Sequence, residues 1–373
     1  MKWNRRHPMS RLVFYISSHG FGHATREIEI INHLPLSVEV EVVTTVPEWL
    51  FRHSIPRPFD YFALAHDPGI VQRDVLTHDA PRTAEAWRRL LETYPKMARD
   101  EAVRIAARGV KVIIGDVSPF AVAVAEAIER PSVIVANFGW GWIFSAFIVE
   151  YQEFIGIIQQ IAAYYRRTDL LLRTPLSGDL SVFPSIQDIP LVVRRSKRTR
   201  REARQALGLD EQARVVLLTF GGQGFQAMAG GAFGRYRDVT FITFDERFRG
   251  EKNVRWVEPR QVYHPDLVRA SDLVLTKLGY GIVTECVAHQ VPMAYPPRTH
   301  FPEHDVLERE TPRYVPLIPM ALDDFMQGNW DFLLDFFAHG PAHPAAPPPD
   351  DSFFTGGSEA ARILCEALEE EGA

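Results

Sequence analysis

The alternation of short apolar runs with longer helical patterns constrains the fold of this chain more than any other feature. In the first half, the expected strands are 12–16, 38–44, 110–115 and 133–136. The expected helices are 24–34, 83–108 and 121–128. Strands that alternate with helices form βαβ units, whose strands lie parallel in one sheet.

The second half repeats the same order of elements. Its expected strands are 214–220, 240–244, 272–276 and 292–295, and residues 282–289 have the spacing of a helix. The sequence therefore predicts an α/β protein with two Rossmann-like, doubly wound domains. The expected parts are an N-terminal domain (1–193), a basic linker (194–210), a C-terminal domain (211–340) and a Pro/Ala-rich segment with a final helix (341–373). Ser358 is the predicted N-cap of that helix.

Charge and cysteine content exclude several classes of protein. The 373 residues include 41 Lys and Arg against 47 Asp and Glu, a net charge of −6, which disfavours a nucleic-acid partner. Two cysteines are too few for a disulfide scaffold or a cysteine-based zinc site. No apolar run has the length of a membrane-spanning helix or of a secretory signal, so we expect a cytoplasmic protein. Nothing in the sequence specifies the oligomeric state.

The basic segment between the halves has two interpretations. Seven of the eleven residues in 194–204 are Lys or Arg. They form either a solvated linker with a helix that ends at Gly208, or a basic wall that faces an anionic ligand. We favour the first because runs of charge usually lie in water.

The segment 17–26, between the first strand and its helix, contains two glycines and two histidines. Gly20 and Gly22 allow a close backbone approach, and a helix N-terminus favours an anion. Thr25 replaces the third glycine of a dinucleotide fingerprint, which disfavours an NAD site. A neutral imidazole of His19 or His23 can take a proton from a hydroxyl near pH 7, although either ring can also simply cap the helix. The spacing supplies no third ligand for a metal ion, so we expect none.

Asp116 follows the strand 110–115, at the edge where open parallel sheets bind ligands. Its carboxylate can orient a protonated histidine from the first loop. The alternative is an N-cap for the helix that begins nearby.

Two glycine-containing turns in the second half are candidate phosphate sites. Gly221, Gly222 and Gln223 follow a strand, where backbone amides can hold a phosphate, but the Lys-Ser/Thr ending of a P-loop is absent. The second turn has Lys277, Gly279, Gly281, Thr284 and Glu285. Its lysine and helix N-terminus can neutralise phosphate, and Glu285 can accept hydrogen bonds from ribose hydroxyls. The alternatives are a plain strand-to-helix turn and a surface position for Glu285.

Taken together, these segments resemble the GT-B glycosyltransferases, in which two Rossmann-like domains face each other across a cleft. The stretch 277–285 is similar to the donor motif of the N-acetylglucosaminyltransferase of peptidoglycan lipid synthesis, and the 18–23 loop to its glycine-rich loop. The chain resembles more closely the glycosyltransferase-like N-terminal region of L-arabinokinase. The shared segments are 19–26, 116–119, 137–140, 190–195, 220–223 and 277–281. It differs from many relatives in Lys277, where they have His, and in Glu303, His304 and Asp305, where they place Gln or Asp-Gln.

The resemblance implies transfer of a hexosyl or N-acetylhexosaminyl group from a nucleoside diphosphate sugar, such as a UDP-sugar, to a hydroxyl. The C-terminal domain would bind the donor through the two glycine turns. The N-terminal domain would bind the acceptor, with Gly20, Gly22 and Asn137 on that side. His23, or else His19, would be the base, steadied by Asp116. Inversion of configuration and independence of metals and other cofactors are expected.

Two other functions remain open at this stage. A nucleotide-sugar epimerase of the same fold would use carboxylates such as Asp116, Glu303 and Asp305, and a non-catalytic module would bind sugar nucleotides without turnover.

The aromatic segment 137–149 can line an acceptor groove or make peripheral contact with a membrane. We favour core packing for it because large aromatic side chains are mostly buried.

Overall fold

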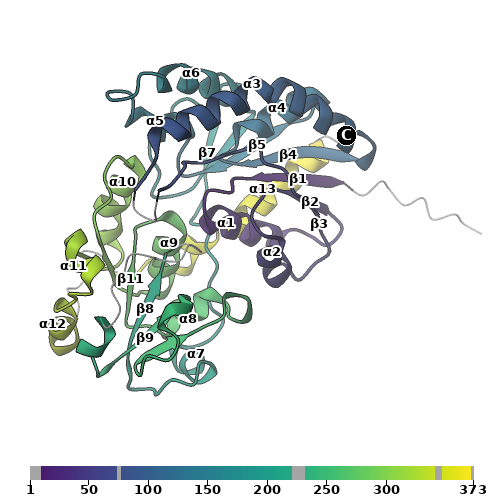
Figure 1. Ribbon diagram of the computed structural model, residues 1–373. Coiled ribbons are helices and arrows are strands. Elements are labelled where there is room, and N and C mark those ends of the chain that lie inside the picture. The colour runs from purple at the N-terminus through teal and green to yellow at the C-terminus, as the bar shows by residue number, and fades with distance from the viewer. Residues whose placement is uncertain (1–9, 74–76, 221–231, 341–346, 371–373) are drawn as a thin grey trace, which may run out of the picture. The chain divides into compact units, whose positions relative to one another are not determined.

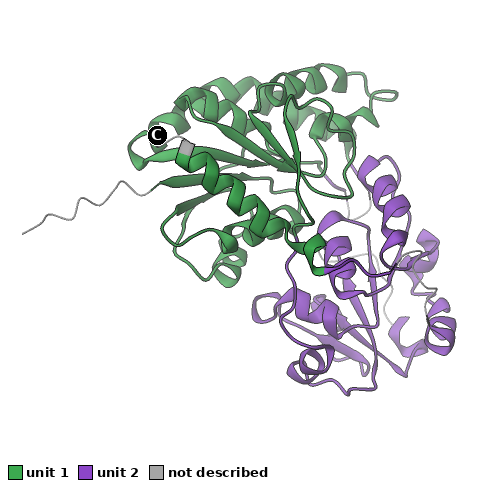
Figure 2. Ribbon diagram, turned by 180° about the vertical axis from the view of Figure 1, so that it is seen from behind, with its two compact units in different colours: residues 1–71, 79–192, 351–373 green, residues 72–78, 193–350 purple. Residues whose placement is uncertain are grey.

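The computed structural model describes residues 10–73, 77–220, 232–340 and 347–370. The chain divides into two compact units, coloured separately in Figure 2. Unit 1 contains residues 1–71, 79–192 and 351–373, and unit 2 contains residues 72–78 and 193–350. Each unit is built around its own parallel sheet.

Unit 1 has a seven-stranded sheet in the order β3-β2-β1-β4-β5-β6-β7, and all of its paired strands are parallel. The strands are β1 (Arg11–Ile16), β2 (Glu39–Val43), β3 (Asp60–Phe62), β4 (Val110–Asp116), β5 (Ser132–Ala136), β6 (Leu170–Arg173) and β7 (Ile186–Asp188). The order reverses direction between β1 and β4, and the carboxyl ends on either side of such a switch form a ligand-binding crevice.

Helices connect these strands and cover the sheet of unit 1 (Figure 1). They are α1 (Phe21–His33), α2 (Glu48–Ser54), α3 (Ala80–Ile105), α4 (Pro119–Ile128), α5 (Trp140–Ser145), α6 (Phe154–Tyr165) and α13 (Gly356–Glu370). The long helix α3 begins at Ala80, and the side chain of its N-cap residue, Asp79, accepts a hydrogen bond from the N–H of Arg82. An acidic N-cap of this kind satisfies an amide that would otherwise lack a partner.

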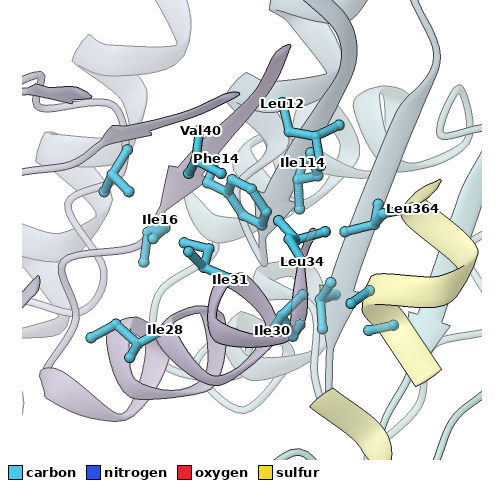
Figure 3. Packing of buried hydrophobic residues seen from close by; sticks show 14 of the residues in the cluster. Leu12, Phe14, Ile16, Ile28, Ile30, Ile31, Leu34, Val40, Ile114 and Leu364 are labelled. Atoms are coloured by element: carbon cyan, nitrogen blue, oxygen red, sulfur yellow. The ribbon is translucent and has the colours of Figure 1, made fainter. Parts of the chain in front are cut away.

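The core of unit 1 explains why the end of the chain belongs to this unit. Phe14 in β1 and Ile31 in α1 are fully buried, and Figure 3 shows them close to Leu364 of α13. Each such side chain contributes about 1.5–3 kcal/mol when it leaves water. The apolar face of α13 therefore packs against α1 and the sheet, although more than 300 residues separate the two helices in the sequence.

Unit 2 has a six-stranded sheet in the order β10-β9-β8-β11-β12-β13, again with parallel pairs. Its strands are β8 (Arg214–Thr219), β9 (Val239–Thr243), β10 (Val254–Trp256), β11 (Leu273–Thr276), β12 (Met293–Tyr295) and β13 (Leu317–Pro319). Its helices are α7 (Arg200–Ala206), α8 (His264–Ala270), α9 (Tyr280–His289), α10 (Pro302–Glu310), α11 (Leu322–Gln327) and α12 (Phe332–His339). The switch between β8 and β11 is the counterpart of the one in unit 1.

The α/β class with two doubly wound sheets is confirmed, and every strand expected from the sequence is present within two residues of its expected ends. Short strands such as β3, β7 and β13 were not expected, because three residues are too few for a pattern. Ser358 is not the N-cap, since α13 begins at Gly356 and the hydroxyl of Ser358 donates to the carbonyl of Thr355 from within the first turn.

The basic segment is structured as part of unit 2. A capping box between Thr199 and Glu202 starts α7, and the chain turns at Gly208 with φ +64°. Most of its basic side chains are exposed, but Arg194 and Arg204 are buried and ion-paired. The segment is therefore more than a solvated connection between the two sheets.

No helix in the described ranges combines the length and apolar character needed to cross a membrane.

Candidate functional site

The turn between β1 and α1 places two histidines at the carboxyl edge of the first sheet. Gly20 precedes the helix with φ +85°, a conformation that costs a glycine little and other residues more. α1 then starts at Phe21, which puts His23 in its first turn. The close backbone approach proposed for Gly20 stays a prediction, and its positive φ shows that the turn itself favours glycine at this position.

His23 contacts Asp116 across the β1–β4 pair. Ile16 and Asp116 are register partners at the ends of the two strands, and Nδ1 of His23 lies 2.9 Å from Oδ1 of Asp116. A nitrogen that faces a carboxylate carries the proton, which leaves Nε2 of a neutral ring as the basic atom. Among the described residues, the one hydrogen bond recorded for the His23 ring is that of Nδ1.

Asp116 is fully buried, and its contacts with Arg26 and His23 keep it ionised. Burial by itself raises the pKa of its carboxyl, but the charge of Arg26 and the hydrogen bonds from His23 and Arg26 lower it below the usual value. The guanidinium of Arg26 donates to the same oxygen, Oδ1, that accepts from His23. The carboxylate is thus used by the imidazole and Arg26, and it does not cap α4, whose N-cap is Ser118.

Arg26 was missed by the sequence analysis and links Asp116 to a residue that was predicted. Its Nη1 donates to Oδ1 of Asn137 at 2.8 Å, and Asn137 follows β5 in the sheet. Asn137 is 1% exposed, so it supports the arginine from inside the unit. The ends of β4 and β5 and the first two turns of α1 therefore meet around the Asp116 carboxylate.

The backbone directly after Asp116 is strained. Val117 has φ 58°, in the left-handed region that a β-branched residue rarely occupies. The hydroxyl of Tyr165 donates to its carbonyl at 2.5 Å and helps to hold it there. Strain of this kind is characteristic of functional sites and fixes the direction in which Asp116 leaves the sheet.

His19 has a different environment from His23. Its Nδ1 accepts a hydrogen bond from the N–H of Ile70 at 3.2 Å, so a neutral His19 carries its proton on Nε2. The ring packs against Gly69, where a Cβ atom would lie 2.6 Å from it. His19 is therefore a hydrogen-bond donor at Nε2, and His23 is the better-placed proton acceptor.

Asp67 is a second buried carboxyl near these rings, and no sequence pattern identified it. It accepts from the N–H of Gly69 and from the indole N–H of Trp140, both at 2.7 Å. Burial raises the pKa of Asp67 to about 6, although these hydrogen bonds oppose the shift. Trp140 also makes an edge contact with His19, with ring centroids 5.5 Å apart.

The aromatic segment after β5 packs inside unit 1, as we favoured. Phe138, Trp140 and Phe144 are at most 2% exposed, and Trp140 stacks on Phe144 with centroids 5.6 Å apart. These rings pack against the turn that carries the two histidines, and they do not form an exposed surface.

The second candidate site lies at the carboxyl edge of the sheet in unit 2. Lys277 follows β11 and is half-buried, and Gly279 is the N-cap of α9. The hydroxyl of Thr284 donates to the carbonyl of Gly281 at 2.9 Å within the first turn. Gly221, Gly222 and Gln223, also predicted for this edge, lie outside the described residues.

Glu285 is buried in α9, so the surface alternative is wrong. Its Oε1 accepts from Nη2 of Arg194 at 2.9 Å, and its Oε2 from Nδ1 of His264 at 2.5 Å. Burial by itself would raise the pKa of Glu285, but His264 and Arg194 lower it to about 2. Neither partner was predicted for this carboxylate, because each is distant in the sequence.

Among the described residues, no group of three or more His, Cys, Asp or Glu side chains is arranged to hold a metal ion.

The same architecture occurs in solved glycosyltransferases. A UDP-glucosyltransferase from Polygonum tinctorium, capable of glucosylating indoxyl, aligns over 98% of this chain and 99% of its own, with a TM-score of 0.61 and 14% identity. The glycosyltransferase SnogD from Streptomyces nogalater aligns over 97% of this chain and 100% of its own, with a TM-score of 0.55 and 17% identity. The chain has the GT-B fold. No family model matches the sequence.

One curated relative is similar in sequence. L-arabinokinase from Arabidopsis thaliana is 30% identical over 375 residues, which cover 95% of this chain and 34% of the relative. The GT-B chain thus spans about a third of the length of that relative. This agrees with the resemblance that the motifs had indicated.

Proposed function

We propose that this GT-B protein is a glycosyltransferase that moves a sugar from a nucleoside diphosphate sugar to an acceptor hydroxyl. The reaction inverts the anomeric configuration and uses no metal ion. The observation that carries the proposal is the orientation of His23 by the buried, ionised Asp116.

His23 acts as the general base. Nδ1 donates to Asp116, so Nε2 receives the proton from the acceptor hydroxyl as its oxygen attacks the anomeric carbon. The imidazolium that forms is stabilised by the Asp116 carboxylate, whose position is fixed by Arg26. His19 donates from Nε2 and orients the acceptor.

Unit 2 binds the donor. Lys277 and the amides at the start of α9 offset the charge that develops on the leaving nucleoside diphosphate, which removes the need for a metal. Glu285 stays ionised at pH values well below neutral. Each of its oxygens has a second lone pair that can accept a hydrogen bond from a ribose hydroxyl. Gly221, Gly222 and Gln223 belong to the same proposed donor site.

The bond changes follow from these roles. The acceptor oxygen forms a bond to the anomeric carbon from the face opposite the diphosphate, and the bond from that carbon to the phosphate oxygen breaks. One displacement at this carbon inverts its configuration. The proton goes to His23, and the electron pair leaves with the nucleoside diphosphate.

Binding and turnover test the proposal separately. Isothermal titration with UDP and UDP-glucose should show saturable binding to the wild-type protein. Release of UDP from UDP-glucose, with a panel of hydroxyl acceptors, should then depend on His23. Full turnover by His23→Ala would refute the mechanism, and absence of nucleotide binding would refute the function.

Incubation with the donor alone separates this function from epimerisation. An epimerase changes the sugar without an acceptor, and it needs a carboxylate that can take a proton from carbon. Asp116 is poorly suited to that role because Arg26 and His23 lower its pKa. We therefore expect the donor sugar to be recovered unchanged.

A further inference from the structure

The loop between β12 and α10 buries a cation that the proposed mechanism does not use. Arg298 is 6% exposed, yet its Nε and Nη2 have no hydrogen-bond partner anywhere in the described ranges of the chain. A buried donor without a partner loses its hydration and gains nothing in return. An arginine in this state points to an anionic group that binds there.

The guanidinium lies at the N-terminus of α10. Its central carbon is 3.7 Å from the centroid of the Phe301 ring, and Phe301 is the N-cap residue of this nine-residue helix. Since the ring covers one face of the guanidinium, its N–H groups can form hydrogen bonds only in the plane of the fork. The first turn has no side-chain cap, and its end of the helix dipole adds to the positive potential, which the side chains of Glu303 and Asp305 in the same turn partly offset.

The charge of Arg298 persists in this environment. Burial lowers its pKa to about 10, and the nearby Glu303 opposes the shift. Glu303 is not a hydrogen-bond partner of Nε or Nη2 of Arg298. Nδ1 of His304 is also buried without a hydrogen-bond partner there, and burial lowers the pKa of that ring. At neutral pH the loop therefore offers the Arg298 cation, and α10 offers the neutral imidazole of His304.

The position of Arg298 in the sheet matches that of the proposed donor site. β11 and β12 are adjacent parallel strands, with Leu275 opposite Ala294. Lys277 follows the carboxyl end of β11 and Arg298 follows the carboxyl end of β12, so both lie at the edge where open sheets bind ligands.

We propose that Arg298 and the first turn of α10 bind an oxyanion of the nucleotide-sugar donor. The planar fork of an arginine matches a carboxylate or a phosphate, which both accept two parallel hydrogen bonds. The two sources in a donor are a carboxylate on the transferred sugar and the diphosphate. This inference rests on the proposed function.

The experiment measures affinity by isothermal titration for UDP, UDP-glucose, UDP-glucuronate and pyrophosphate, with wild-type protein and with Arg298→Met and Arg298→Lys. We expect Arg298→Met to weaken binding at least tenfold for the ligand that carries the recognised oxyanion. Arg298→Lys should fall between, because it keeps the charge and loses the fork. The melting temperature of the ligand-free Arg298→Met protein should equal or exceed that of the wild type, because the substitution removes buried N–H donors that have no hydrogen-bond partner.

Arg204→Met is the matched control. Arg204 is 3% exposed, but its guanidinium is fully used by the carbonyls of Ala270 and Glu211 and by Asp272. Its replacement should lower the melting temperature and leave the affinities unchanged, the opposite pattern to Arg298→Met.

The outcomes test the Arg298 site and the proposed function separately. An equal loss of affinity in Arg298→Met for UDP, UDP-glucose and UDP-glucuronate assigns the diphosphate as the bound oxyanion. A loss of affinity for UDP-glucuronate alone assigns the sugar carboxylate. Unchanged affinities in Arg298→Met, with normal UDP binding by the wild type, overturn the Arg298 site and leave the proposed function intact. If the wild type binds only pyrophosphate, and through Arg298, the anion site stands and the donor function fails. Absence of binding to all four ligands overturns both.

Discussion

Each unit contains a buried carboxylate held by one arginine and by Nδ1 of one histidine, and the two arrangements differ in what the histidine does next. In unit 1, Asp116 is bound by Arg26 and His23, and the one hydrogen bond recorded for the His23 ring in the described structure is that of Nδ1. In unit 2, Glu285 is bound by Arg194 and His264, and Nε2 of His264 lies 3.2 Å from the hydroxyl of Thr219.

The carboxylates are also used differently. Oδ1 of Asp116 accepts from both of its partners, while Oδ2 is buried with no hydrogen bond to a described residue. Glu285 gives one oxygen to each partner. In the proposed function, the same three side-chain types support a proton acceptor in unit 1 and a fixed anionic hydrogen-bond acceptor in unit 2. The partner of the far imidazole nitrogen decides between these roles.

Replacing the two histidines gives the largest contrast. His23→Ala should lower kcat by about 10²–10⁴-fold, the contribution of a positioned general base. His264→Ala should act mainly on KM for the donor. His264 contacts Glu285, the proposed hydrogen-bond acceptor for the donor's ribose, and it does not contact the attacking hydroxyl. Steady-state kinetics with a working acceptor measure both, and equal losses of kcat would remove the distinction between the two sites.

Removing the arginines tests whether both carboxylates are stabilised in the same way. Arg26→Met and Arg194→Met should each cost about 3–5 kcal/mol in the free energy of unfolding, because a buried carboxylate loses a cation. Denaturant unfolding measures this cost, with the exposed Arg88→Met as control, for which a change within about 0.5 kcal/mol is expected. A small loss in only one unit would show that its histidine alone suffices.

The pH dependence of stability sharpens the comparison at Glu285. Its pKa in the folded state is about 2, below the value of 4.5 for an unperturbed Glu, so its stabilisation is complete above about pH 4.5 and is lost as the pH falls toward 2. The shift corresponds to about 3 kcal/mol. Unfolding from pH 6 to pH 2.5 should therefore show a difference between wild type and Glu285→Gln that shrinks with acidification.

Glu246→Gln is the control for that series, because Glu246 is 76% exposed and should give no such trend. If the stability of the wild type and that of Glu285→Gln changed with pH in parallel, the ionised form of Glu285 would not be stabilised by its neighbours.

The smallest effect concerns the turn that positions His19 in unit 1. Gly69→Ala places a Cβ 2.6 Å from the His19 ring at a φ of +58° and should cost about 1–2 kcal/mol. Gly156→Ala, in α6 with open space around its Cβ, should instead stabilise by about 0.5–1 kcal/mol. Thermal denaturation compares the two, and equal changes would show that the His19 turn is not tightly packed.

Local patterns were sufficient to predict the turns that carry the two sites. Buried strands ending at Ile16, Asp116 and Thr276 are continuous apolar runs, and the glycines and polar residues after them mark strand-to-helix turns. This is why the sequence indicated His23, Asp116 and Glu285 as candidate site residues. Arg26 and Arg194 were read as ordinary helix and linker residues, because nothing in their neighbourhood marks them as buried.

By itself, the sequence determined the strands, the turns that follow them and the chemical groups at the edges of the sheets, since these depend on residues close together in the chain. Only the tertiary structure decided which charges meet. His23 and Asp116 are 93 residues apart, and Arg194 and Glu285 are 91 apart, so their contacts arise from the order of strands in each sheet. The sequence also could not show that Arg298 is buried with N–H groups that lack a hydrogen-bond partner. Burial is a property of the folded chain and depends on the packing around the side chain.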